Sequence, residues 1–226
     1  MIKKARSSQR REEALSPESI IDASIELLDI SGEAGLTFRA LSERLATGPG
    51  AIYWHIANKS DLLTASCDAI IARTMDTCVV SAKPKATIRA LALGLFDAID
   101  AHPWVGSALT SPAGLLPMVR ILEPLGQQVR ALGVPDKEQW ATVSALLHYI
   151  LGVGGQNAAN GQLARAQGLD RDDFLEVVAT MWSQLDPHEY PFTRSLAGQV
   201  RAHDDRVDFL AGIDLILKGI NSLRRR

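Results

Sequence analysis

The sequence has little of what catalysis or metal binding requires. It contains two cysteines and five histidines in 226 residues. The histidines show no HxxxH or HExxH spacing, and the chain carries no GxSxG, phosphate-loop or GxGxxG motif. The stretch "GVGG" at 152–155 lies inside an expected helix and has no strand before it. We therefore expect no catalytic residue, no metal ion and no cofactor.

Long hydrophobic runs are also missing. No stretch of ~18 apolar residues could cross a membrane, and the basic N-terminus lacks the apolar segment of a secretory signal. Cys67 and Cys78 fall on one expected helix, which would hold them roughly 16 Å apart, too far for a disulfide. These absences are typical of a reduced, cytoplasmic protein without a membrane partner.

Positive charge is scarce overall but concentrated at the two ends of the chain. The net charge is −2, and 46% of the residues are apolar, which favours a packed core. The terminal basic residues are Lys3, Lys4, Arg6, Arg10, Arg11 and Arg224 to Arg226. We expect residues 1–15 to form a flexible basic tail that is either simply solvated or in contact with DNA phosphates.

Alternating strand patterns are missing as well, and helical periodicity dominates the chain. Ser16 followed by Pro17 predicts the first capped helix start. We expect an all-α fold with helices over about 17–31, 37–46, 49–56, 59–80, 85–101 and 103–110, a segment ending near 133, and further helices over 136–160, 171–184 and 204–223.

One interrupted stretch, "TFRALSERLATGPGAIYWHIANKSDLL", spans residues 37–63. A helix stops near Ala46, and a second helix of barely two turns runs from Pro49 to Ile56. We expect Gly48 to take turn angles that side chains forbid, and Pro49 suits the first turn of a helix. Two short helices joined by such a turn form a helix-turn-helix.

The second helix of this motif has two different sides. Ile52 and Ile56 point inward, which leaves small residues and three adjacent rings, Tyr53, Trp54 and His55, on the outer side. A helix with small outward residues near its start can lie deep in the major groove of DNA. The tyrosine hydroxyl, the imidazole and Lys59 can donate to phosphate oxygens. The alternative is that the rings only cap the core.

These residues also resemble a known family. The order "SPESIIDASIELLDISGEAGLTFRALSERLATGPGAIYWHIANKSDLL" is similar, over about fifty residues, to the DNA-binding domain of the tetracycline-repressor (TetR) family of bacterial transcription regulators. The segments "LDPHEYPF" and "DFLAGIDLILKGI" resemble the C-terminal part of one branch more weakly. Carried over by position, the resemblance implies DNA contacts by Thr37, Arg39, Gly48, Pro49, Gly50, Tyr53, Trp54, His55 and Lys59.

The sequence departs from the family pattern inside the motif. Thr47 and Gly48 stand where the family commonly has an apolar residue followed by a serine cap, and Trp54 stands where a polar or basic residue is common. These departures bear on which bases are read. We expect residues 16–62 to form a three-helix, helix-turn-helix DNA-binding domain. Residues 63–226 are then a larger α-helical ligand-binding and dimerisation domain.

Two apolar seams predict a dimer. The final helix carries Phe209, Ile213, Ile216 and Ile220, and the long helix carries Val143, Leu147, Ile150 and Leu151. Two such helices from each of two chains would make a four-helix bundle, and TetR-like proteins dimerise through two such helices. A dimer presents two copies of the short helix over Pro49 to Ile56, about one DNA turn (~34 Å) or more apart. The alternative is that both seams are intrachain core.

The resemblance further implies an inducer cavity. The stretch "DAIDAHPWVGSALTSPAGLLPMVRILEPLG" is apolar, broken by prolines and dotted with polar groups that need partners if buried. The candidate lining residues are His102, Trp104, Met118, Leu122, Trp140, Ser144, His148 and Gln156, although a lone histidine or tryptophan on an apolar face is more often core. We expect a homodimeric repressor that an apolar small molecule releases from a palindromic double-stranded DNA operator.

Two other classes of protein remain open from the residues alone. An all-helical enzyme would convert a ligand and show no operator-like DNA preference. A sequence-nonspecific architectural DNA-binding protein would bind scrambled DNA and a palindrome equally well. The net charge of −2 argues against the second class, because sequence-independent affinity rests mostly on the release of counterions from DNA.

Overall fold

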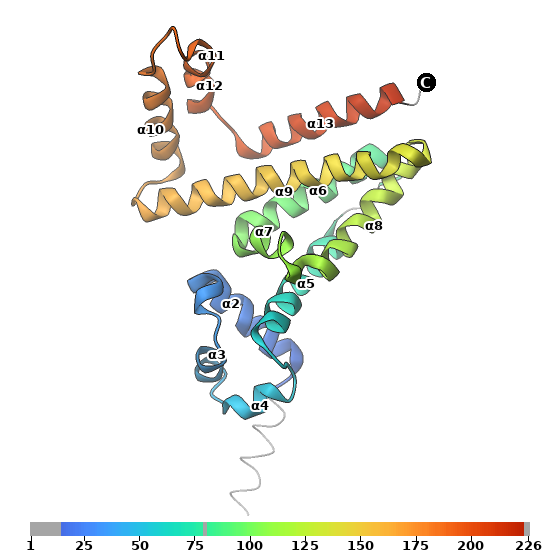
Figure 1. The fold of residues 1–226 in the computed structure, drawn as a ribbon, viewed down its shortest axis with the longest axis vertical. Coiled ribbons are helices and arrows are strands. Elements are labelled where there is room, and N and C mark those ends of the chain that lie inside the picture. The colour runs from blue at the N-terminus through green and yellow to red at the C-terminus, as the bar shows by residue number, and fades with distance from the viewer. Residues whose placement is uncertain (1–14, 79–80, 224–226) are drawn as a thin grey trace, which may run out of the picture.

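The computed structural model describes residues 15–78 and 81–223. The helices, numbered as in Figure 1, are α2 (Pro17–Gly35), α3 (Phe38–Arg44), α4 (Pro49–Tyr53), α5 (Lys59–Thr77), α6 (Pro84–Ala101), α7 (Trp104–Leu109), α8 (Leu115–Ala131), α9 (Asp136–Ala166), α10 (Arg171–Ser183), α11 (Pro191–Ser195), α12 (Ala197–Arg201) and α13 (Asp205–Leu223). A 3-10 turn, η1 (Pro112–Gly114), precedes α8. These ranges contain no strand, so the predicted all-α fold is confirmed. The expected basic tail falls almost wholly in residues 1–14, which lie outside the described residues.

Most helix ends follow the capping residues. The Ser16 hydroxyl accepts from the Ser19 amide at 3.1 Å, which caps α2. The helix breaks at Gly32, near the expected end, since Gly32 takes the non-helical angles φ 62° and ψ −169°, and a short helical segment follows this kink up to Gly35. Helix α9 runs past its expected end near Asn160, and the glycine with a positive φ (69°) that follows its last turn is Gly168.

Helices α2, α3, α4 and the first turn of α5 pack around a small apolar core at one end of the molecule (Figure 1). Ile20, Leu41, Ile52 and Leu62 in this core are fully buried. The expected domain boundary between residues 62 and 63 falls inside α5. One continuous helix therefore joins this end of the molecule to the rest.

The larger part of the molecule is built on α5, α6, α8 and α9, and α13 lies along α9 on the side away from α4 (Figure 1). Ile71, Leu95, Ile121 and Leu146, one from each of the four helices, have no exposed surface. Among the described helices, none has both the length and the hydrophobicity needed to cross a bilayer.

Helices α10 to α12, called the arm below (residues 171–201), pack mainly on one another. Ala179 and Ala197 are buried between them, and Arg201 Nε lies 2.5 Å from a Glu176 carboxylate oxygen. At the base of the arm, Arg171 Nε lies 2.5 Å from Asp205 Oδ2 of α13. Figure 1 shows the arm at the upper left, beside the start of α13.

A polar contact joins α2 to α7. Asp29 Oδ1 accepts from the indole Nε1 of Trp104 at 2.7 Å and lies 2.8 Å from His102 Nδ1. Trp104 is only 6% exposed, so its N–H depends on this acceptor.

We expect Asp29→Ala to lower the free energy of unfolding by about 1–2 kcal/mol, because a buried donor would lose its partner. Asp29→Asn keeps an acceptor oxygen at this position and is the matched control in urea unfolding. Equal urea midpoints for Asp29→Ala and the parent protein would contradict the stabilising role of Asp29.

The thiol of Cys67 is sealed in the core. It is fully buried, and burial, followed by the neighbouring Asp68 charge, raises the pKa of Cys67 to about 12. At pH 8 only about one thiol in ten thousand would be ionised, so we expect iodoacetamide to leave Cys67 unmodified in the native protein. Mass spectrometry after treatment in 6 M guanidinium, where the thiol titrates near its ordinary pKa of 9.0, provides the comparison. Because folding raises the pKa of Cys67, the neutral thiol stabilises the folded protein fully below pH 9. This contribution to the free energy of unfolding is lost as the pH rises toward 12.

Candidate nucleic-acid interface and internal cavities

The turn between α3 and α4 sets the direction of the shorter helix. Thr37 caps α3, since its hydroxyl accepts from the Ala40 amide at 3.1 Å. Ala46 takes a positive φ of 49°, and the Thr47 amide donates to the Ser42 carbonyl at 3.0 Å. Gly48 has an ordinary φ of −82°, so the expectation that Gly48 supplies the unusual angle is wrong. The left-handed residue is instead the one that closes the end of α3, and here that residue is alanine.

Helix α4 turns its outer side to solvent at the end of the molecule opposite α13 (Figure 1). Trp54 is 89% exposed and Tyr53 53%, and Gly50 and His55 are exposed beside them. On the inner side, Ile52 is fully buried. Because so much aromatic surface is exposed to water on the outer side of α4, this side is suited to contact another molecule.

The neighbours of α4 hold its outer side in place. The ring of Tyr53 stacks on Phe38 of α3, with centroids 4.2 Å apart and planes 9° from parallel. Asn58 caps α5 by accepting from the Asp61 amide at 2.9 Å. Lys59 Nζ donates to the Glu33 carbonyl of α2 at 2.5 Å, which fixes the start of α5 beside the kinked end of α2. The surface is therefore formed before any partner binds.

Comparison with known proteins assigns the family. The family model for bacterial regulatory proteins of the tetR family matches residues 20–65. The transcriptional regulator SCO7222, a TetR from Streptomyces coelicolor, is 53% identical, with 93% of this chain and 99% of that chain covered and a TM-score of 0.81. The chain belongs to the TetR family.

Other TetR proteins match over different lengths. Tetracycline repressor protein class D from Escherichia coli is 45% identical over 62 residues, which are 27% of this chain and 28% of that repressor. This chain thus matches little more than a quarter of that repressor's length. The structure of apo ActR from Streptomyces coelicolor is 18% identical, covers 93% of this chain and 97% of ActR, and has a TM-score of 0.71, which shows a shared fold. The prediction of a helix-turn-helix, DNA-binding transcription regulator is confirmed.

The residues implied as DNA contacts come together on this TetR helix-turn-helix. Thr37, Arg39, Gly48, Pro49, Gly50, Tyr53, Trp54 and His55 are exposed, and Lys59 is half-buried. Arg39 pairs with Glu43 at 3.0 Å, yet its side chain is 89% exposed and remains accessible. Their individual roles in DNA contact stay predictions.

Two cavities lie away from this surface. The larger, of about 580 Å³, lies between α6, α9, the arm and α13. The smaller, of about 450 Å³, lies between α2, α7 and α9, next to the contact of Asp29 with Trp104. Both volumes suit small-molecule ligands. Within the described part of the chain, no group of three or more His, Cys, Asp or Glu side chains is arranged to hold a metal ion.

The predicted ligand-binding residues are dispersed over the TetR fold. Gln156 lines the larger cavity and Trp104 the smaller, beside His102. Met118, Leu122, Trp140, Ser144 and His148 line neither of these two cavities, and Trp140 is 71% exposed. Sequence reasoning missed the aromatic residues around the larger cavity, of which Tyr149 and Phe174 are half-buried and Phe96 and Phe209 are only 2% and 1% exposed. These rings come from four helices, and helical spacing within each does not show which faces meet.

The predicted dimer residues lie mainly inside a single chain. Val143, Leu147, Ile150, Phe209, Ile213 and Ile220 are buried, and Leu151 and Ile216 are half-buried. The reason is that both helices turn these side chains toward other helices of the same chain; Phe209, for example, stacks on Phe96 with centroids 4.6 Å apart. The intrachain-core alternative therefore describes most of these side chains. Within residues 205–220 of α13, the large hydrophobic side chains Val207 and Leu215 are exposed, at 63% and 67%.

Proposed function

We propose that the protein is a homodimeric, cytoplasmic TetR repressor that a small molecule releases from a palindromic operator. Residues 16–62 serve as the DNA-binding domain, and residues 63–226 serve as the ligand-binding and dimerisation domain. The observation that carries this proposal is the outer side of α4, where Trp54 is 89% exposed beside Tyr53 and His55 on a motif that the family model matches.

The proposed contact places α4 in the major groove. Gly50 and Ala51 bring the backbone of α4 close to the base edges, because neither carries a large side chain. The Tyr53 ring is already ordered by its stack on Phe38, so its hydroxyl reaches a phosphate oxygen with little further loss of freedom. Arg39 and Lys59 add positive charge at the two edges of the contact.

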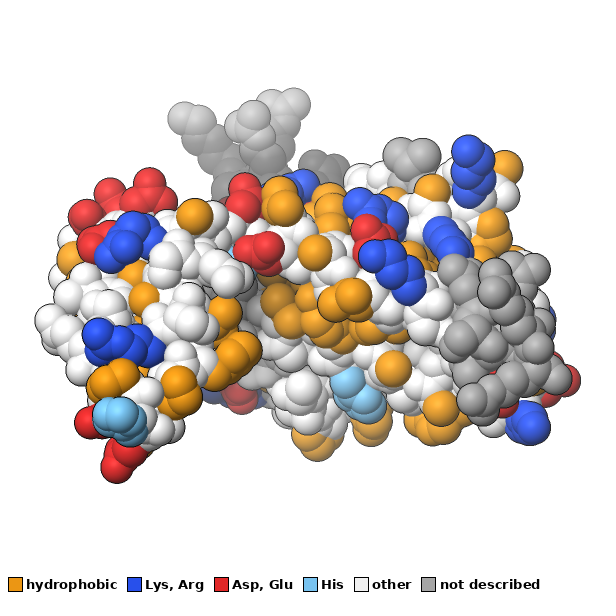
Figure 2. Space-filling model, turned by 90° about the horizontal axis from the view of Figure 1, so that it is seen from above, with side chains coloured by type: hydrophobic (Ala, Val, Ile, Leu, Met, Phe, Trp, Pro, Cys, Tyr) orange, Lys and Arg blue, Asp and Glu red, His pale blue; other side chains and the backbone are white. Residues whose placement is uncertain are grey.

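A second copy of the chain sets the distance between two such helices. One α4 is only five residues long and reads few base pairs, whereas a twofold dimer doubles the contact. Figure 2, which looks onto the α13 side, shows hydrophobic side chains along the middle of this face and on the arm. Val207 and Leu215 of α13 and Met181 and Phe192 of the arm are exposed, and these apolar side chains support a dimer surface.

Release by a small molecule is supported by the two cavities and by one structural relative. ActR has been solved in complex with actinorhodin and with (S)-DNPA, and it shares the fold of this chain. A ligand that prefers the arrangement in which the two α4 helices are wrongly spaced must weaken DNA binding, and DNA must weaken ligand binding by the same factor. Helix α5, which starts at the DNA-binding end and enters the larger helical body, carries the change.

Selection of bound DNA from a random pool tests this function. We expect the recovered sequences to share a palindrome with half-sites about one DNA turn (~34 Å) or more apart. Analytical ultracentrifugation of the same protein should give the mass of a dimer. Equal affinity for scrambled DNA would identify a nonspecific DNA-binding protein instead, and a monomer at every concentration would refute the dimer.

A further inference from the structure

The larger cavity has the size and the walls of a ligand site. It measures about 580 Å³ and lies where α6, α9, the first helix of the arm and α13 meet. Gly152 of α9 lies on its wall, and a Cβ at this position would meet no heavy atom within 4 Å, so the space beside it is open. Its lining contains both apolar and polar side chains.

Aromatic residues form part of the lining. Tyr149 of α9 and Phe174 of the arm are half-buried and offer ring surface to the cavity, and Leu175 lies next to Phe174. Phe209 of α13 is only 1% exposed; it stacks on Tyr149, with centroids 5.6 Å apart, and on Phe96 of α6, with centroids 4.6 Å apart. The Tyr149 hydroxyl donates to the Phe209 carbonyl at 3.1 Å, which holds the Tyr149 ring in place. The half-buried rings suit a flat, aromatic molecule.

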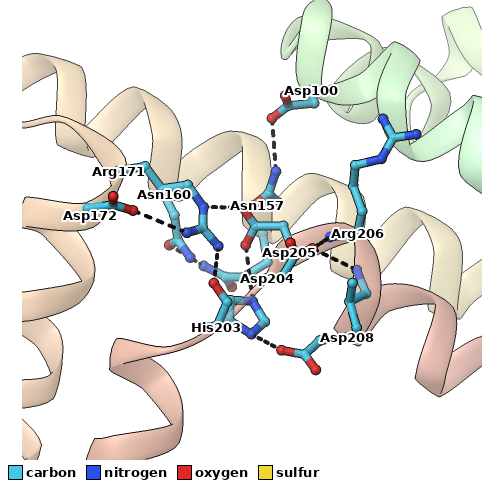
Figure 3. A network of polar contacts seen from close by, with 12 residues as sticks. Asp100, Asn157, Asn160, Arg171, Asp172, His203, Asp204, Asp205, Arg206 and Asp208 are labelled. Carbon is cyan, nitrogen blue, oxygen red and sulfur yellow. Dashed lines mark hydrogen bonds and ion pairs between the residues drawn. The ribbon is translucent and has the colours of Figure 1, made fainter.

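Carboxylates outnumber cationic groups among the polar lining residues, some of which Figure 3 shows. The lining carboxylates are Asp100, Asp170, Asp205 and Asp208, and the lining cationic groups are Arg165, Arg171 and His203. Four carboxylates against two guanidinium groups leave a formal charge of −2 with His203 neutral, or −1 with His203 protonated. The C-terminal end of α6, next to Asp100, adds the negative end of a helix dipole, whereas the starts of α10 and α13, next to Asp170 and Asp205, add positive ends.

Several of these charges are already engaged. Asp170 caps α10 by accepting from the Asp173 amide at 2.9 Å. Arg171 lies 2.5 Å from Asp205 Oδ2 and also donates to the His203 carbonyl at 2.6 Å (Figure 3).

Asp100 and Asp208 have other partners. Asp100 accepts from the Asn157 side-chain amide at 2.8 Å (Figure 3). His203 lies between two carboxylates, because its Nδ1 contacts Asp208 and its Nε2 lies 3.0 Å from Asp205 Oδ1. No guanidinium contact is found for either of these two carboxylates within the described residues. They are therefore the groups on the wall most able to take a cation.

One of these carboxylates lies near the Tyr149 side chain. Burial, and after it the Asp208 charge, raises the pKa of the Tyr149 phenol. Carboxylates beside a half-buried ring favour a ligand that carries positive charge on a flat apolar body, because ring faces attract cations as well.

We propose that this cavity binds a planar aromatic molecule that carries a positively charged nitrogen. The ring system lies against Tyr149 and Phe174, and the cation lies beside Asp100 and Asp208. The regulatory meaning of this site rests on the proposed function, since the cavity is assigned here as the place where a releasing ligand binds.

Two dyes with the same xanthene ring system and opposite charge test the site. Rhodamine 123 is cationic and fluorescein is anionic at neutral pH, and fluorescence anisotropy reports the binding of each to the full chain. We expect rhodamine 123 to bind at least about 10-fold more tightly, and Asp100→Asn or Asp208→Asn to weaken it by about 10-fold, the usual effect of losing a contact to a charged group. Asp172→Asn is the matched control, because Asp172 lies outside the lining and its side chain is 96% exposed.

A cavity-filling variant gives an independent readout. Gly152→Leu places a side chain in the open space and should abolish rhodamine 123 binding while the thermal unfolding midpoint is kept or raised. Equal affinity for the two dyes, or unchanged rhodamine 123 binding in Gly152→Leu and in both aspartate variants, would overturn the site.

A gel shift with operator DNA separates the two proposals. If rhodamine 123 binds as expected but leaves DNA binding unchanged, the site stands and release by a ligand at this site fails. If instead other small molecules release the DNA while rhodamine 123 shows no preference over fluorescein, the proposed function stands and this site fails.

Discussion

A glutamate at position 50 is expected to lower operator affinity by about 100-fold or more while the fold stays intact. Gly50 lies on the exposed outer side of α4, and a Cβ at this position would meet no heavy atom within 4 Å. The variant should therefore fold normally. In the DNA complex, however, the new carboxylate would face phosphates and base acceptors, and like charges brought together in an interface cost several kcal/mol, or about 100-fold in affinity.

The matched control is Gly50→Gln, which adds nearly the same volume without charge. We expect the glutamine variant to lose much less affinity than the glutamate variant in gel shifts at the same salt concentration. Circular dichroism melts should show similar midpoints for both variants. If Gly50→Glu bound the selected operator as tightly as the parent, α4 would not be the helix that enters the groove.

An alanine at position 212 is expected to destabilise the packing of α13 by about 2 kcal/mol. An added Cβ would lie 1.9 Å from the Tyr149 hydroxyl oxygen and 2.3 Å from its ring carbon Cζ, so Tyr149 must move. That movement disturbs the stack on Phe209 and the hydrogen bond to the Phe209 carbonyl. In a chain of this size, such a loss lowers the thermal midpoint by about 4–8 °C.

The same helix provides the control. A Cβ on Gly219 would meet no heavy atom within 4 Å, so Gly219→Ala should raise stability by up to about 1 kcal/mol through helix propensity. A second substitution, Tyr149→Leu, removes the clashing atoms. In a double-mutant cycle, the cost of Gly212→Ala should then largely disappear. A full cost in the Tyr149→Leu background would show that the clash is not with this ring.

The DNA-binding surface could be predicted from the sequence because nearby residues determine it. Thr37, Pro49 and Asn58 each set a helix start within a few residues of their own positions, and all three starts are found. The turn itself was less predictable. Glycine at position 48 suggested a left-handed residue, but hydrogen bonding at the end of α3 places that conformation on Ala46.

The larger cavity could not be predicted because it depends on how helices far apart in the sequence are rotated against each other. Asp170 and Asp204 cap helices, as acidic residues at helix starts commonly do. Asp170 also lines the cavity, as do Asp205 and Asp208, which follow Asp204 in the same acidic stretch. The periodic seam of Phe209, Ile213 and Ile220 likewise fits a partner chain or the chain's own core equally well, and only the packing of α13 on α6 and α9 decides between them.

The kinked end of α2 is attached to its surroundings at two neighbouring points. Asp29 contacts His102 and Trp104 at α7, and the Glu33 carbonyl accepts from Lys59 at the start of α5. The first contact ties α2 to the larger part of the molecule, and the second ties α2 to the start of α5 within the DNA-binding end. A small shift of α7 should therefore pass through α2 to the start of α5, and α3 and α4, which share a core with these two helices, should move with them as one body.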